Sequence, residues 1–168
     1  MREIGGQQAL LALGTDVAQI GFVVKDLNRT LETHRAMGPW RIYTHDAARV
    51  PGMHIGGIPA SFKFRLAINS AVPQIEFIEP VDGPNPYQEW LDEKGEGIHH
   101  LGFHIPDAAA TTSVMEALGV RVIMGGTGYG RDGSGAYCYY DTVDLLGYIS
   151  EAIELPRKRW DPDAVILP

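Results

Sequence analysis

An internal repeat constrains the fold of this chain more than any other feature of its sequence. Residues 19–26 (QIGFVVKD) align without a gap with residues 100–107 (HLGFHIPD), at an offset of 81. Residues 74–79 (QIEFIE) align with residues 149–154 (ISEAIE) at an offset of 75, so a loop in the second half is six residues shorter. Two matches in the same order indicate a duplicated supersecondary unit.

Both halves predict the same order of elements. Runs of apolar and β-branched residues indicate strands, and Asp26 and Asp107 are suited to cap the helix that follows the first strand of each half. In the first half we expect strands at 17–24, 40–45, 62–68 and 74–78, with a helix from 26 that Gly38 ends. In the second half we expect strands at 100–105, 120–124, 136–141 and 148–153, with a helix at 107–118.

The predicted fold class is therefore α+β, with tandem βαβββ modules that form an open, barrel-like mixed-sheet cleft. We expect two four-stranded sheets, each with its helix packed on one face. The expected parts are a first module at 16–80, a connector with a short helix at 81–97, a second module at 98–155 and a C-terminal surface extension at 156–168.

The repeat also predicts a metal site. Strand side chains alternate between faces, so Gln19 and His100 are repeat-related and both lie on the face opposite the helix, beside a glycine. Glu76 and Glu151 are related by the second match and interrupt apolar strands, where a carboxylate is costly unless it is paired or binds metal. Taken singly, Glu76 fits a surface position and His100 a hydrogen-bonded core histidine. Together, the four donors suit one divalent ion of Zn, Co, Mn, Ni or Fe.

Composition excludes several other classes. Acidic residues number 21 against 14 basic ones, and this balance argues against nucleic acid, whose phosphates need a basic face. The single cysteine, Cys138, excludes an intrachain disulfide and a thiolate metal cluster. No apolar run approaches the roughly 20 residues of a membrane span, and the N-terminus has no signal-peptide pattern. We therefore expect a cytoplasmic protein without membrane or nucleic-acid partners.

At these residues the sequence resembles the vicinal oxygen chelate superfamily, with the methylmalonyl-CoA epimerase-like members closest in pattern. The segments that carry the resemblance are 18–27 (AQIGFVVKDL), 74–80 (QIEFIEP), 97–101 (GIHHL) and 147–151 (GYISE), and the most specific is Gly-Ile-His-His. The resemblance places metal ligands at Gln19, Glu76, His100 and Glu151. Epimerases usually have His at the first position, whereas Gln, Glu, His, Glu is a set found in lactoylglutathione lyases of the superfamily.

The resemblance implies chelation of two neighbouring substrate oxygens, followed by removal of an α-proton. In the epimerases the proposed base is a glutamate, and the nearest match here is Lys63, which is a clear departure from the pattern. Glu151, Glu76 or His104 is an alternative base, and His104 also fits a core histidine. Expected substrate contacts are Arg65, His54, Tyr139 and Arg131.

Residues 128–133 spell G-x-G-x-x-G, but a strand-like run follows where a dinucleotide fingerprint needs a helix. We interpret this segment as a hairpin loop that carries Arg131. Tyr137 and Tyr139 share one strand face and Tyr140 has the other, so one of these faces is expected to line the cleft.

Three functions compete on this fold. The leading hypothesis is a metal-dependent isomerase, epimerase or lyase that acts on a small carbonyl, carboxylate or acyl-thioester substrate with adjacent oxygens. The alternatives are a non-enzymatic binding or resistance protein and a metal-dependent dioxygenase, although iron of the extradiol type uses two histidines and one carboxylate. The resemblance also implies a homodimer.

Overall fold

The computed structural model describes residues 2–168, with side chains from residue 5 onward. It has the expected βαβββ order twice, which confirms the predicted fold class. The first module consists of β1 (Gln19–Val23), α2 (Leu27–Thr33), β2 (Trp40–His45), β5 (Lys63–Ile68) and β6 (Gln74–Asp82). The second consists of β7 (Gly97–His104), α4 (Ala108–Ala117), β8 (Val122–Tyr129), β9 (Gly135–Tyr140) and β10 (Ile149–Glu154).

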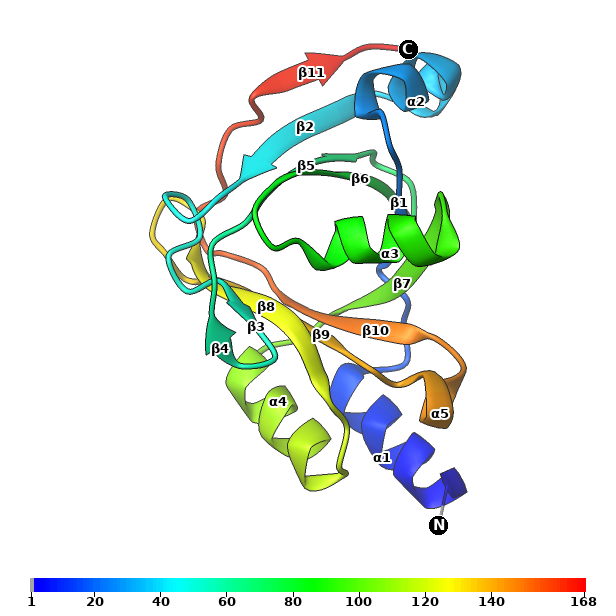
Figure 1. Ribbon diagram of the computed structural model, residues 1–168, viewed down its shortest axis with the longest axis vertical. Coiled ribbons are helices and arrows are strands. Elements are labelled where there is room, and N and C mark those ends of the chain that lie inside the picture. Colours follow the sequence, from blue (N-terminus) through cyan, green and yellow to red (C-terminus); the bar gives the residue numbers. More distant parts are fainter. Residues whose placement is uncertain (1) are drawn as a thin grey trace.

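The two expected four-stranded sheets are joined edge to edge into one sheet. Antiparallel pairing of β1 with β7 links the modules, so that the described residues form one sheet of 11 strands in the order β11-β2-β5-β6-β1-β7-β10-β9-β8-β3-β4. Figure 1 shows this sheet curling, with the first module above and the second below. The join follows from the repeat, because the two first strands lie side by side about a pseudo-twofold axis.

The two module helices begin in the same way. The side chains of Asp26 and Asp107 accept hydrogen bonds from the third residue along, as expected for N-caps. The first helix is shorter than predicted, because α2 ends at Thr33 and a 3-10 turn, η1 (Arg35–Met37), replaces its last turns. Trp40 is buried at this end and donates its indole N–H to the carbonyl of His34.

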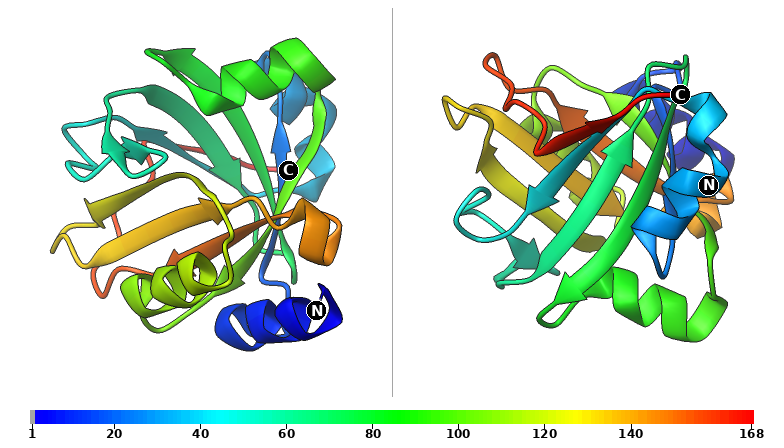
Figure 2. Two further views of the ribbon diagram at one scale, coloured as in Figure 1. Left: turned by 60° about the horizontal axis from the view of Figure 1, so that its bottom comes forward. Right: turned by 90° about the horizontal axis from the view of Figure 1, so that it is seen from above.

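Three apolar clusters stabilise the curl. On the convex side, α2 packs on the first module, and α4 packs on the second together with α1 (Arg2–Leu13), a helix the sequence did not predict. Figure 2 shows α1 and α4 on the same side of the sheet. The third cluster fills the concave side and includes Tyr87 and Leu91 of α3 (Pro86–Lys94), the helix expected in the connector.

Two short segments cross between the modules. The hairpin of β3 (His54–Ile55) and β4 (Ile58–Pro59) leaves the first module and pairs with β8 of the second. The C-terminal segment follows β10, and its strand β11 (Ala164–Ile166) pairs with β2 of the first. The tail is therefore an added edge strand rather than a loose surface extension. A one-turn helix, α5 (Val143–Leu146), was also not predicted. No helix among residues 2–168 is long and apolar enough to cross a membrane.

Candidate metal centre

Strand register brings the four predicted ligands into two parallel rows on the concave face. In the first row Gly21 of β1 lies between Glu76 of β6 and His100 of β7. In the second row Gly102 of β7 lies between Gln19 of β1 and Glu151 of β10. The rows are related by the repeat, since each contains one central glycine and one ligand from either side.

The central glycines leave the space in which the ligand side chains converge. A Cβ atom at Gly21 would lie 1.9 Å from Cε1 of His100, so no other residue fits beneath that ring. A Cβ atom at Gly102 would lie 3.2 Å from Oε1 of Gln19 and 2.9 Å from the terminal methyl of Ile153. The imidazole and the amide thus each lie over the glycine of the neighbouring strand.

The ligand atoms are buried and have no hydrogen bonds. Nε2 of His100 lies 3.0 Å from Oε2 of Glu151 and 3.4 Å from Oε2 of Glu76, and one ligand atom from each residue falls within 4.8 Å of the others. These contacts lack hydrogen-bond geometry, so these three atoms and Oε1 of Gln19 are buried without a hydrogen-bond partner among the described residues. Buried polar atoms are rarely left this way unless a ligand or an ion satisfies them.

The electrostatics of the site match a cation position. Burial opposes the charged imidazole, but the carboxylates of Glu151 and Glu76 outweigh burial and raise the pKa of His100 to about 9. Burial also raises the pKa of Glu76, against the effect of His100. Two buried carboxylates that repel each other are stabilised by any positive charge between them, whether a proton on His100 or a metal ion.

A neighbouring histidine orients His100. Nδ1 of His99 lies 3.1 Å from Nδ1 of His100, which leaves Nε2 of His100 directed at the carboxylates. His99 is itself buried and packs edge-on against Trp90, and burial holds its pKa well below the usual value. A neutral His99 can accept the Nδ1 proton of His100, and such outer partners fix the tautomer of metal-binding histidines. The donor set of one imidazole, two carboxylates and one amide therefore fits a divalent ion of the transition series.

A cavity of about 150 Å³ opens beside these residues. An enclosed cavity of that size accommodates a molecule about as large as benzene, so the part of a ligand inside it is expected to be compact. Gln19, Glu76 and Glu151 line one part of it. Aromatic side chains line most of the rest: Tyr43, His45, Phe64, Tyr87, Tyr129, Tyr137, Tyr139 and Trp160.

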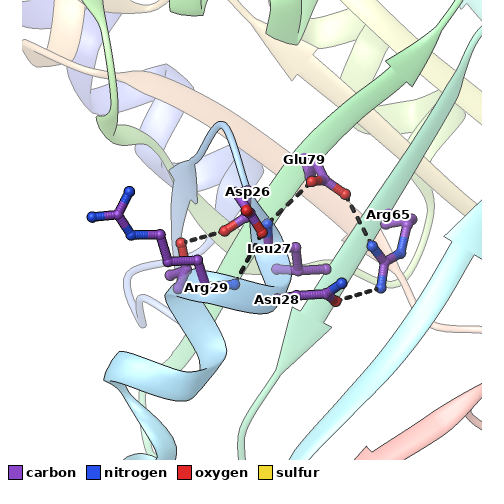
Figure 3. A network of polar contacts seen from close by, with 7 residues as sticks. Asp26, Leu27, Asn28, Arg29, Arg65 and Glu79 are labelled. Carbon is purple, nitrogen blue, oxygen red and sulfur yellow. Dashed lines mark hydrogen bonds and ion pairs between the residues drawn. The ribbon is translucent and has the colours of Figure 1, made fainter.

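Four of the residues predicted as bases or substrate contacts do not line this cavity: Lys63, Arg65, His54 and Arg131. Lys63 and Arg65 lie on the other face of β5, because Phe64, Leu66 and Ile68 are the residues that line the cavity. Figure 3 shows Arg65 directed at the start of α2. Its guanidinium pairs with Glu79 of β6 and donates a hydrogen bond to the side chain of Asn28 of α2.

His54 is also outside the cavity, because pairing of β3 with β8 places its ring over Gly125. These positions correct the expectation that Lys63, Arg65 and His54 meet substrate.

Tyr139 and His104 line the cavity, whereas Arg131 does not. Tyr139 lines it and packs its ring edge-on against His100, with centroids 4.9 Å apart, while its hydroxyl accepts a hydrogen bond from Tyr87. His104 lines the exposed part, and its pKa is lowered by partial burial and by Arg159. Arg131 forms an ion pair with Asp161 of the tail and does not line the cavity.

Sequence reasoning missed the part of the wall contributed by the tail and by β2. Arg159 and Trp160 line the cavity from the tail, and Arg41, Tyr43 and His45 line it from β2. The alternation of Arg41, Tyr43 and His45 along one strand face was the available signal. Nothing in the repeat pointed to the tail, since it has no counterpart in the first half.

Comparisons with known proteins agree with this fold. The sequence profile of the glyoxalase/bleomycin resistance protein/dioxygenase superfamily matches residues 18–139. A search of curated proteins finds no match. Among solved structures, methylmalonyl-CoA epimerase from Mycobacterium tuberculosis matches with a TM-score of 0.57 at 23% identity, over 86% of this chain and 91% of that chain.

Two other solved structures have a similar fold. A variant of Streptomyces coelicolor methylmalonyl-CoA epimerase, in complex with 2-nitronate-propionyl-CoA, matches with a TM-score of 0.58 at 19% identity, over 87% of this chain and 98% of that one. A hypothetical protein from Bacillus halodurans matches with a TM-score of 0.58 at 17% identity, over 86% of this chain and 97% of that chain. At these identities the likeness establishes the fold.

Proposed function

Because the chain belongs to the glyoxalase/bleomycin resistance protein/dioxygenase superfamily, we propose that it is a divalent-metal-dependent isomerase or epimerase. It moves a proton on the carbon next to a carbonyl group of a compact substrate. The observation that carries the proposal is the set of four buried ligand atoms, from Gln19, Glu76, His100 and Glu151, that have no hydrogen-bond partner among the described residues. The similarity in fold to methylmalonyl-CoA epimerases supports the same class of reaction.

The residues of the site have two roles, metal binding and proton transfer. Gln19, Glu76, His100 and Glu151 would hold the ion, and a bound ion would supply Lewis-acid chemistry that makes the C–H next to the substrate carbonyl more acidic. Glu76 and Glu151 come from opposite modules and are the only carboxylates among the described residues that line the cavity. One carboxylate oxygen takes the proton from one side of the substrate carbon, and a proton returns from the other side or to a neighbouring atom.

The wall of the cavity protects this proton transfer. Tyr139 holds the ring of His100 in place, and the aromatic side chains around it exclude water. A low-dielectric surrounding strengthens the attraction between the ion and developing negative charge. A dioxygenase is less well supported, because the site has one histidine and two carboxylates rather than two histidines and one carboxylate.

A binding protein without turnover remains the second candidate. One observation favours it: Lys63, the nearest match to the base of the epimerases, lies outside the cavity. Proton transfer then depends on residues that also hold the ion, or on His104 at the mouth. Stoichiometric binding of a ligand without proton exchange identifies this candidate.

The test is exchange of the α-proton with solvent deuterium, followed by NMR, in protein loaded with Co, Ni, Mn or Zn. The substrate panel consists of acyl thioesters and α-hydroxycarbonyls. Glu76→Gln and Glu151→Gln should each slow exchange by roughly 100-fold or more, the usual contribution of a positioned base. Glu79→Gln is the matched control, since this carboxylate is on the same strand as Glu76 but contacts α2 on the convex side. Metal-loaded protein that exchanges no proton across the panel would overturn the proposal.

A further inference from the structure

Two further buried polar atoms in the cavity have no partner. Besides the four ligand atoms, Nδ1 of His45 and the hydroxyl of Tyr137 lack a hydrogen bond to any described residue, although His45 is 8% exposed and Tyr137 is 6% exposed. Both side chains line the same cavity as Glu76 and Glu151. Nδ1 of His54 and Nε1 of Trp90 also lack partners, but neither residue lines the cavity.

Packing holds His45 and Tyr137 close together. Their ring centroids are 6.3 Å apart, with the rings nearly perpendicular. His45 also stacks on Phe64 at 4.9 Å and meets the ring of Trp160 edge-on at 5.3 Å. Rings held this firmly cannot turn toward other partners, so their free polar atoms are available to a ligand.

Two positive charges lie in the same cavity. The guanidinium groups of Arg41 and Arg159 line it, and among the described residues its only carboxylates are the two that face the metal position. Arg41 is committed to the carbonyl of Asn69 and the hydroxyl of Ser70. Arg159 has no hydrogen bond or ion pair with another described residue, although it neighbours Trp160 in the tail. An exposed arginine alone is often merely solvated, and Arg159 gains significance because it lines the same cavity as the two buried atoms.

At neutral pH both Tyr137 and His45 are in protonation states that can donate a hydrogen bond to a ligand. Burial and the neighbouring Glu151 raise the pKa of Tyr137, so its hydroxyl remains a donor. Burial and the charge of Arg49 lower the pKa of His45 to about 4, so its imidazole is neutral and offers one N–H.

The tail that carries Arg159 is fixed on both sides. The backbone N–H of Arg131 donates to the carbonyl of Lys158, and the Arg131 side chain pairs with Asp161. Further along, Asp163 accepts hydrogen bonds from Arg49 and from the backbone of Thr44. Arg159 is therefore held at the mouth of the cavity by contacts to both modules.

We propose that Tyr137, His45 and Arg159 form a second site in the cavity that binds a carboxylate of the substrate, separate from the oxygens that face the metal ligands. The substrate is then a compact acid with a metal-chelating end and a second, anionic end. This inference rests on the proposed function and adds a substrate class to it. The aromatic wall between the two ends accommodates the short apolar body of such a molecule.

The test uses two probes of equal chain length, the dianion 2-oxopentanedioate and the monoanion 2-oxopentanoate. Binding to metal-loaded protein is measured by calorimetry at 0.15 M salt, where long-range charge effects are screened beyond about 8 Å. The dianion should bind about tenfold or more tightly than the monoanion, as expected for one added charge-assisted hydrogen bond. Tyr137→Phe and Arg159→Gln should each remove most of this preference and leave the affinity for the monoanion unchanged.

Arg157→Gln is the matched control, because Arg157 is an exposed arginine of the same tail that faces Asp132. Equal affinities of the wild type for the two probes would overturn the inference, as would a loss in Arg157→Gln as large as that in Arg159→Gln. Failure of the proposed function gives a different result. In that case removal of the metal leaves the affinity for the monoanion unchanged, whatever the preference for the dianion.

Discussion

The two modules carry the same chemistry but are covered differently. Each contributes one ligand from its first strand and one glutamate from its last, and each places a glycine beneath a ligand of the other. Each also uses a second glutamate three residues further on, since Glu79 and Glu154 accept hydrogen bonds from the backbone N–H of Leu27 and Ala108 at the helix starts. The modules differ in the segment of each that pairs with the other: the β3–β4 hairpin of the first module pairs with β8, and the tail after β10 pairs with β2.

The repeated and the unrepeated segments contribute different parts of the site. The metal rows and the helix caps lie in repeated segments, so they are present twice. The β3–β4 hairpin and the tail are not repeated, and the tail supplies Arg159 and Trp160 to the cavity wall. We infer that the duplicated core sets the class of chemistry and that unrepeated segments set what enters.

The largest expected effect is a difference in metal affinity between substitutions of the two central glycines, Gly21 and Gly102. Gly21→Ala puts a methyl group into the ring of His100, which cannot be relieved without moving that ring. Gly102→Ala meets the mobile end of Ile153 at 2.9 Å and Cβ of Gln19 at 3.1 Å, where a smaller shift suffices. We expect Gly21→Ala to lower metal affinity by more than about 100-fold and Gly102→Ala by less than about tenfold, judged against the effect of outer-shell changes. Competitive titration with a fluorescent chelator measures both. Equal losses would contradict the proposed difference between the rows.

The next effect is the pH dependence of metal binding. With a pKa of about 9, His100 carries a proton in metal-free protein at neutral pH, and an ion must displace this proton. Metal affinity should therefore rise with pH, by up to about tenfold per unit, and level off above pH 9. Proton release on binding, measured in two buffers of different ionisation enthalpy, checks the same linkage. A metal affinity that is flat between pH 6.5 and 9 would show that the ion does not displace a proton from His100.

A smaller effect concerns stability and not binding. Glu79→Ala and Glu154→Ala each remove an acceptor at a helix start and should each destabilise the protein by about 1 kcal/mol. Glu79 also pairs with Arg65 at 3.1 Å, so its loss should cost slightly more. Urea unfolding monitored by circular dichroism measures the difference. Neither variant should alter metal affinity, and a change there would mean that the convex face is coupled to the site.

The smallest effect is expected for Arg65→Gln. This partly exposed pair with Glu79 should contribute no more than about 1 kcal/mol, and substrate affinity should be unchanged. The same urea and calorimetric measurements apply. A clear loss of substrate affinity would restore Arg65 as a substrate contact.

Sequence reasoning predicted that the four candidate ligands lie together because the repeat supplied two constraints at once. Alternation along a strand fixed the face of Gln19 and His100, and the offset related Glu76 to Glu151. Alternation could not say which face of residues 62–68 lines the cavity. The charged residues Lys63 and Arg65 were assigned to the cleft, yet the apolar Phe64 and Leu66 line it, because burial there favours apolar side chains and the charges pair outside.

The path of the tail could not be predicted from local pattern. It depends on contacts between residues far apart in the sequence, such as Asp163 with Arg49 and Asp161 with Arg131. Residues 156–168 have a basic triplet and three prolines but no periodicity. The prediction of a homodimer stays a prediction.

The most direct measurement of the central claim is metal content by plasma emission, on protein purified without chelator. The comparison is between the wild type, the double variant His100→Ala with Glu151→Ala, and the control Glu154→Ala on the convex side of the same strand. We predict near-stoichiometric metal in the wild type and the control, and none in the double variant. Wild-type protein that holds no metal, even after addition of Co, Mn, Ni or Zn, would contradict the account.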